Sequence, residues 1–324
     1  MLSRVANSFY WIARYIERAE NYARFISVNL NLIPDLPSGS GEQWEPLIFT
    51  SGDQELFKER YGEPSRENVI RFLTFDESNP NSIFSCIHSA RENARTIREN
   101  LPSELFEQIN KYYLSVQNTM THNRFALSES ATFYSEIRNA SHLVNGISDS
   151  CLTHTEGWHF LNIGRLLERA DKASRLLDVK YFILLPSVST VGTPFDLLQW
   201  SALLKSISAF QMYHKKYSKS SPQTIAEFIL LDREFPRSIH YCLIHAETSL
   251  RQISGSEPSN ETSLNILLDF SNIAQKKLGL LRSELDIISI EEIFNFGLHE
   301  YLDKLQIEIN NVGLAIHETF FSPN

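Results

Sequence analysis

The chain has 324 residues, of which 42% are hydrophobic, and its 39 acidic and 30 basic residues give a net charge of −9. This acidic balance argues against a general nucleic-acid-binding protein, which needs clustered Lys and Arg to neutralise phosphates. With only 12 Gly and 12 Pro to interrupt the chain, long helices with few breaks are expected.

The N-terminal residues and the cysteines bear on where the protein works. Residues 1–21 contain charges and no uninterrupted apolar run, so we expect no signal peptide. No stretch approaches the roughly 20 apolar residues that a membrane-spanning helix needs. Cys86, Cys151 and Cys242 are odd in number and form no Cys-x-x-Cys pair, which favours reduced, buried thiols. The sequence therefore predicts a cytoplasmic protein without a membrane segment.

The first predicted helix begins near Ser3, and its apolar residues recur at alternating spacings of four and three, as on one face of a helix. These residues are Val5, Phe9, Ile12, Ile16, Ala19, Ala23, Ile26 and Leu30. A second helix of this kind carries Phe160, Ile163, Leu167, Ala170, Leu177 and Tyr181.

The other predicted helices are less sharply defined. They lie near 42–60, 66–74, 80–100, 103–123, 127–155, 194–217, 222–231, 236–253, 260–284 and 290–318. No run of alternating strand residues stands out. The sequence therefore predicts an all-α fold, a multi-helix bundle without a sheet.

The two striped helices share a charged signature at a displacement of 151 residues. RYIERAENYAR at 14–24 aligns with RLLERADKASR at 165–175, with five identities in eleven positions. Residues 80–97 align with 236–253 at a displacement of 156, with seven identities in eighteen positions. This self-similarity predicts an internal duplication, with halves near 1–155 and 156–324 that pack as one domain over 1–324.

The charged residues of the signature lie off the apolar stripe, on a face that also carries Trp11 and Tyr15. They are Arg14, Glu17, Arg18 and Arg24 in the first copy and Arg165, Glu168, Arg169 and Arg175 in the second. A solvated face with ordinary helix ion pairs is the simplest interpretation. However, a helix that is apolar on both sides is usually buried, and buried charges have to pair.

Two compatible interpretations of a buried signature follow. In the structural one, Glu17 and Glu168 are hubs that hold Arg side chains from neighbouring helices. In the functional one, surplus Arg groups form a fork that binds a carboxylate or a phosphate. Glu17 and Glu168 are also the candidate acid/base residues if the protein is an enzyme.

Two further charged stretches are binding candidates. Arg91, Glu92 and Arg95 form one, and Thr248 replaces Glu92 in the aligned second half. Arg237 belongs to the other, within 232–238, where a helix-capping turn is the preferred interpretation. Only one Glu-x-x-His occurs, whereas di-iron bundles need two, and no phosphate-binding glycine loop is found. We therefore predict no metal site and no cofactor.

These segments resemble the bacterial alpha-E proteins, a family described as predicted helical with a shared Glu-Arg motif. The similarity covers nearly the whole chain. It is carried by MLSRVANSFYWIARYIERAEN at 1–21, SARENAR at 89–95, GRLLERA at 164–170 and FPRS at 235–238. The resemblance implies that the protein is encoded beside two others, an ATP-grasp protein of circularly permuted type and a transglutaminase-like cysteine peptidase. It thereby implies a role in making or modifying peptides or amide-linked small molecules.

Three functions are compatible with this sequence. The first is a non-catalytic scaffold or substrate-presenting partner of an ATP-grasp amide ligase, which holds an acidic peptide or small molecule. The second is an enzyme that uses Glu17 or Glu168 beside Arg partners. The third is a purely structural or oligomerisation protein, such as a homo-oligomer. None of the three requires nucleic acid or a membrane.

Overall fold

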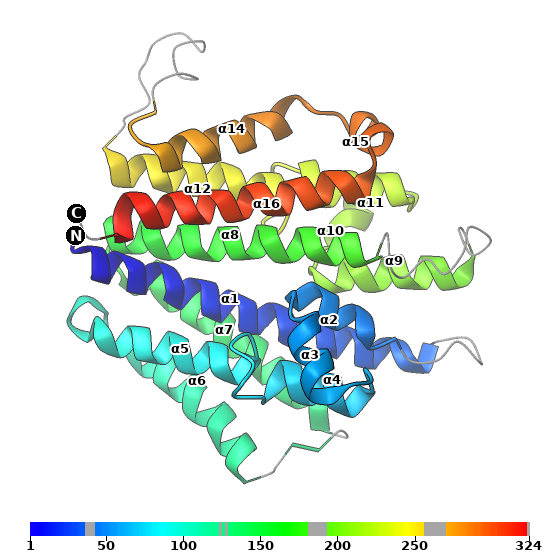
Figure 1. The fold of residues 1–324 in the computed structure, drawn as a ribbon, viewed down its shortest axis with the longest axis horizontal. Coiled ribbons are helices and arrows are strands. Elements are labelled where there is room, and N and C mark those ends of the chain that lie inside the picture. Colours follow the sequence, from blue (N-terminus) through cyan, green and yellow to red (C-terminus); the bar gives the residue numbers. More distant parts are fainter. Residues whose placement is uncertain (36–42, 123–124, 127–128, 181–192, 256–269, 323–324) are drawn as a thin grey trace.

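Two long helices, α1 (Ser3–Leu32) and α8 (Glu156–Asp178), lie side by side through the middle of the molecule in a computed structural model (Figure 1). The structure describes residues 1–35, 43–122, 125–126, 129–180, 193–255 and 270–322. No strand occurs in these ranges, which confirms the all-α class and the multi-helix bundle.

Each central helix belongs to a set of four long helices. α1 contacts α5 (Ile83–Thr96) and α7 (Ser130–Cys151), and α6 (Ser103–Thr121) packs against both. In the same way α8 contacts α12 (Ile239–Ser254) and α16 (Leu298–Ile316), and α14 (Ile273–Ile287) packs against both. The two sets lie on opposite sides of the central pair (Figure 1). This equivalence of order and neighbours is consistent with the duplication, which stays a prediction from the sequence.

Shorter helices complete the bundle. They are α2 (Glu45–Ser51), α3 (Gln54–Tyr61), α4 (Arg66–Thr74), α9 (Pro194–Ser206), α10 (Phe210–Lys216), α11 (Pro222–Leu231) and α15 (Ile290–Phe296), with 3-10 turns at Ile33–Asp35 and Arg98–Asn100 and a π-helical turn at His317–Phe321. α2 touches α8, and α9 touches α1, so each central helix also meets a short helix that follows the other one.

Three predicted helices are broken in the structure. The helix expected at 42–60 is split into α2 and α3 by Gly52, whose φ is +80°. The helix at 194–217 is split near Ser208, with φ of 57°, and that at 290–318 at Gly297, with φ of 111°. Residues in this left-handed region end a helix, and periodicity alone does not reveal them.

The apolar stripes of both central helices are buried, as predicted. Ile12, Ile16 and Ala19 of α1 and Ile163, Leu167 and Ala170 of α8 are at most 1% exposed. Tyr181 and residues 260–269, also predicted to be helical, lie outside the described residues. No helix in the described ranges is both long and apolar enough to cross a membrane.

The central helices run in the same direction, and their backbones come close together at Gly164. Gly157 faces the ring of Phe9, and a Cβ atom at Gly164 would overlap the carbonyl oxygen of Tyr10. Further along, the Lys172 ammonium lies 5.5 Å from the centre of the Tyr22 ring. Because glycine has no side chain, the backbones can approach here, and the charged residues that follow on both helices face one another.

Candidate functional site

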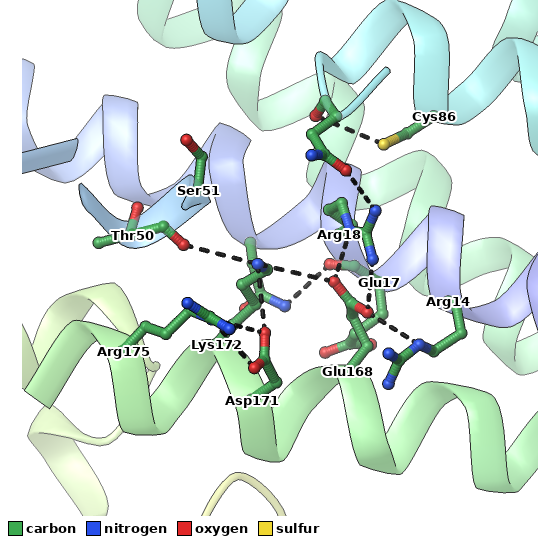
Figure 2. Close-up of polar contacts among 12 residues, drawn as sticks. Arg14, Glu17, Arg18, Thr50, Ser51, Cys86, Glu168, Asp171, Lys172 and Arg175 are labelled. Atoms are coloured by element: carbon green, nitrogen blue, oxygen red, sulfur yellow. Dashed lines mark hydrogen bonds and ion pairs between the residues drawn. The ribbon is translucent and has the colours of Figure 1, made fainter. Parts of the chain in front are cut away.

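Glu168 is fully buried where α8 meets α1 (Figure 2). Arg18 donates to both of its oxygens, from Nε to Oε1 at 2.6 Å and from Nη2 to Oε2 at 3.0 Å. The Nε atom of Arg14 lies 3.0 Å from Oε2, and the Nζ atom of Lys172 lies 3.9 Å from Oε1. Three cations therefore surround one carboxylate inside the protein.

Glu17 occupies the corresponding position on α1 and is 1% exposed. Arg169 donates to both of its oxygens, from Nε to Oε1 at 2.8 Å and from Nη2 to Oε2 at 3.0 Å. Arg237, from the turn before α12, donates from Nη1 to Oε1 at 3.3 Å. Arg169 also donates from Nη1 to the carbonyl oxygen of Pro236 at 3.0 Å, which ties this turn to the pair.

The two Glu-Arg dipeptides therefore pair reciprocally: Arg18 binds Glu168, and Arg169 binds Glu17. The paired positions are those that the displacement of 151 residues makes equivalent. A two-pronged bond between guanidinium and carboxylate fixes both distance and orientation. We call these contacts the reciprocal pairs, and they fasten α1 to α8.

Comparison with known proteins shows that this motif belongs to a family. The Alpha-E family model, described as a predicted alpha-helical domain with a conserved ER motif, matches residues 1–321. The chain belongs to the Alpha-E family. Two of its Glu-Arg dipeptides, 17–18 and 168–169, form the reciprocal pairs. In this Alpha-E chain the motif thus has a structural role that can be described atom by atom.

Relatives of this Alpha-E chain include uncharacterized proteins from Mycobacterium bovis and Mycobacterium tuberculosis. Each is 23% identical over 277 residues, which cover 79% of this chain but 30% of the relative. The chain therefore spans less than a third of the length of these relatives. No solved structure shows significant similarity to it.

Further charged residues extend the site along both helices. Arg175 donates from Nε to Asp171 at 3.0 Å, and Lys172 lies 3.3 Å from the same carboxylate (Figure 2). Arg24 pairs with Glu20 on α1. Sequence reasoning had not named Glu20, Asp171 or Lys172 as site residues, although Glu20 aligns with Asp171 in the internal repeat. That retained acidic position was the signal that could have identified Glu20 and Asp171. No such signal marks Lys172, which aligns with Asn21.

The 232–238 stretch proves to be both a capping turn and part of the site. Asp232 accepts from the backbone amides of Glu234 and Phe235, and Ser238 caps α12. Arg237 at the same time reaches Glu17 and Glu20. The turn geometry directs this guanidinium toward α1.

Other predicted binding residues lie outside the reciprocal pairs. Arg165 donates to Asn162 at 2.7 Å and lies 3.6 Å from Asp149. Arg91 donates to Asn110 of α6 at 2.7 Å, and Glu92 pairs with Arg91 and Arg95 at the surface. No described hydrogen bond or ion pair joins this α5 group to the reciprocal pairs.

The electrostatics keep both hub carboxylates ionised. Burial acts to raise the pKa of Glu17, but Arg169 and Arg237 outweigh burial and lower it to about 2. Burial likewise opposes ionisation of Glu168, yet Arg18 and Arg14 hold its pKa below the ordinary value. A general acid or base works best when its pKa lies near the operating pH. These two carboxylates are therefore suited to binding cations and poorly suited to general acid or base catalysis.

Thiol and metal chemistry find little support in the described residues. Cys86 and Cys242 are buried, and burial raises the pKa of each thiol to about 12. Cys151 is exposed, so the expectation of a buried thiol was wrong there: it ends α7 at the surface. No group of three or more His, Cys, Asp or Glu in the described ranges is placed to hold a metal ion.

An open cavity of about 760 Å³ lies away from the reciprocal pairs, among α3, α4 and α6. Arg60, Arg71, Asp76 and Phe125 are among its lining residues, and the lining includes none of the motif residues. The signature therefore does not form the wall of this cavity.

Proposed function

We propose that the chain is a non-catalytic helical accessory protein, a scaffold or substrate-presenting module for an ATP-grasp type amide ligation or peptide-modification system. One observation carries this proposal: both candidate catalytic carboxylates, Glu17 and Glu168, are buried and paired with Arg side chains. Such groups organise the fold and are not available to a substrate.

The relatives support a role beside another polypeptide. In each of them the similar region makes up 30% of a much longer chain. A helical unit joined to a larger protein is typical of a module that works together with its neighbour. The proposed partners of this chain are an ATP-grasp protein and a transglutaminase-like peptidase. Both are implied by the family resemblance.

An excess of cations distinguishes this proposal from a purely structural role. Around Glu168 and Asp171 stand four cations: Arg14, Arg18, Lys172 and Arg175. A network that served only to join helices would gain most from balanced charges, because each uncompensated buried charge is costly. The surplus favours a protein that also binds an acidic group.

Co-purification tests the proposal directly. The tagged full chain is mixed with an ATP-grasp protein of circularly permuted type, the partner that the family resemblance implies, with and without ATP, and the bound fraction is measured. We expect a complex in at least one of these conditions. Absence of association in both would overturn the accessory role.

A second assay distinguishes the accessory protein from an enzyme that uses Glu17. Glu17→Gln is tested in a reconstituted ligation reaction, at a temperature where circular dichroism shows the variant to be folded. We expect turnover to be retained. Loss of turnover in the folded variant, with association intact, would favour the enzyme over the accessory protein.

A further inference from the structure

A second group of charged side chains lies beside the Glu17 hub, where α1, α7 and the turn before α12 meet. Arg237 donates from Nη2 to Glu20 at 3.1 Å, and Arg24 pairs with the other oxygen of Glu20. The Nε2 atom of His142, on α7, lies 3.9 Å from that same oxygen, and its side chain is 53% exposed. His142 therefore marks the side from which solvent reaches the group.

The charges of this group do not balance. Arg24, Arg138, Arg169 and Arg237 supply four cations, whereas Glu17 and Glu20 supply two carboxylates. Arg138 lies one helical turn before His142 on α7, so both side chains project from the same side of that helix. Arg138 is half-buried and forms no ion pair or hydrogen bond within the described part of the chain. Among the described residues, this guanidinium has no counter-charge.

Arg24, although paired with Glu20, has one polar atom that the described residues leave without a partner. Its residue is 7% exposed, and its buried Nε atom has no hydrogen-bond partner among the described residues. A buried guanidinium N–H without a partner is costly, and an added anion would accept from it.

We propose that this group binds a phosphate group among Arg24, Arg138 and Arg237, with His142 at its solvent edge. The surplus of two positive charges matches the charge of a phosphate monoester near neutral pH. Guanidinium forks donate in the geometry that phosphate oxygens accept. The proposal rests on the accessory function, since it names the chemical class of the acidic group that the module presents.

The corresponding region around Glu168 has the same surplus of cations, and Arg14 has buried Nε and Nη1 atoms without a hydrogen-bond partner among the described residues. The other three cations of that region are each paired. There Lys172 also reaches the carbonyl oxygen of Thr50 at 3.5 Å, and Arg175 donates to both oxygens of Asp171 at 3.0 Å. Arg18 is bound by Asn81 as well as by Glu168. Of the cations in the two regions, Arg138 is the one without an ion pair or hydrogen bond in the described part of the chain, which favours the α7 side as the binding site.

Titration of the purified full chain with inorganic phosphate at constant ionic strength tests this site. Wild type is expected to bind phosphate and to unfold at a higher temperature when phosphate is present. Arg138→Gln is expected to weaken binding by about tenfold or more, because a charge-assisted contact is lost. Its unfolding temperature without phosphate should equal or exceed that of wild type, because Arg138 has no ion-pair partner among the described residues.

Matched variants and ligands make the outcome decisive. Arg71→Gln makes the same substitution at an exposed residue lining the other cavity and should leave phosphate affinity unchanged. Arg138→Lys should retain part of the affinity. Equal binding by wild type and Arg138→Gln, no binding by wild type, or equal binding of acetate and phosphate would each overturn the proposal.

The two proposals can fail separately. Phosphate binding is measured on the isolated chain, and the accessory role is measured by co-purification with its partner. A chain that associates but does not bind phosphate keeps the accessory function and loses this site. A chain that binds phosphate through Arg138 without associating keeps the site and loses the accessory function.

Discussion

Glu17 and Glu168 remain charged inside the protein because each faces at least two cations. Removing a carboxylate from water costs several kcal/mol, and a single opposite charge often fails to offset that cost. Here a two-pronged Arg contact is supplemented by a second Arg in each case. Removal of either Glu would leave its buried Arg partners facing one another, and removal of one Arg would leave a buried carboxylate with fewer counter-charges.

Acid should weaken the fold through Glu17. Its pKa is about 2 in the folded protein against an ordinary value of 4.5, so the unfolded chain binds more protons between these limits. The stabilisation is fully present above about pH 5 and is lost as pH falls toward 2, a change on the order of 3 kcal/mol.

Urea unfolding of wild type and Glu17→Gln across this pH range measures the effect. The free energy of unfolding of wild type should fall more steeply with decreasing pH than that of the variant, because the amide does not titrate. Identical slopes for the two proteins would show that Glu17 is not held ionised by its Arg partners.

At the scale of helices, the crossing of α1 and α8 depends on Gly164. A methyl group there would meet the backbone of Tyr10, which cannot move away without displacing α1. We expect Gly164→Ala to lower the free energy of unfolding by about 1–3 kcal/mol, as overpacking does.

Gly146, in α7, is the matched control because a Cβ atom there would meet nothing within 4 Å. Gly146→Ala should raise stability by about 0.5–1 kcal/mol, since alanine favours the helix over the unfolded chain. Thermal or urea unfolding compares the two variants. A gain in stability from Gly164→Ala would mean that the helices do not need this close approach.

The sequence predicted where the helices lie better than it predicted which helices pack against each other. Alternating spacings identify the buried stripe of α1, because local periodicity directly records which face is apolar. The same periodicity holds no information on which helix lies opposite, so the bond from Arg18 to Glu168 could not be assigned. Arg237 was recognised as a candidate from its aligned segment. Arg138 and His142 were missed, because their importance arises only where α7 meets α1.

At the scale of the molecule, the apolar core is continuous from Val5 in α1 to Phe321 at the end of the described chain. The reciprocal pairs lie within the contact between the two helix sets. We therefore expect both sets to unfold together, even though each has its own central helix.

Single-tryptophan variants can follow the two sets separately. Trp44 reports on the segment before α2 and Trp200 on α9, and both are at most 3% exposed. With the other tryptophans replaced by Phe, urea transitions at the two positions should have the same midpoint. Separate midpoints would mean that the halves are independent folding units.

The central claim is that the Glu-Arg motif holds the two central helices together, and a double-mutant cycle on Glu17 and Arg169 tests it. The variants Glu17→Gln, Arg169→Met and their combination are compared with wild type by urea unfolding. Glu17→Gln should cost about 3–5 kcal/mol, because it leaves Arg169 and Arg237 buried without their carboxylate. The double variant should lose less than the sum of the single losses, with a coupling of about 1–3 kcal/mol.

The surface pair Glu92 and Arg95, changed in the same way, provides the reference and should show a coupling below about 1 kcal/mol. If the Glu17 and Arg169 variants lose no more than this reference and their effects are additive, the motif does not fasten α1 to α8.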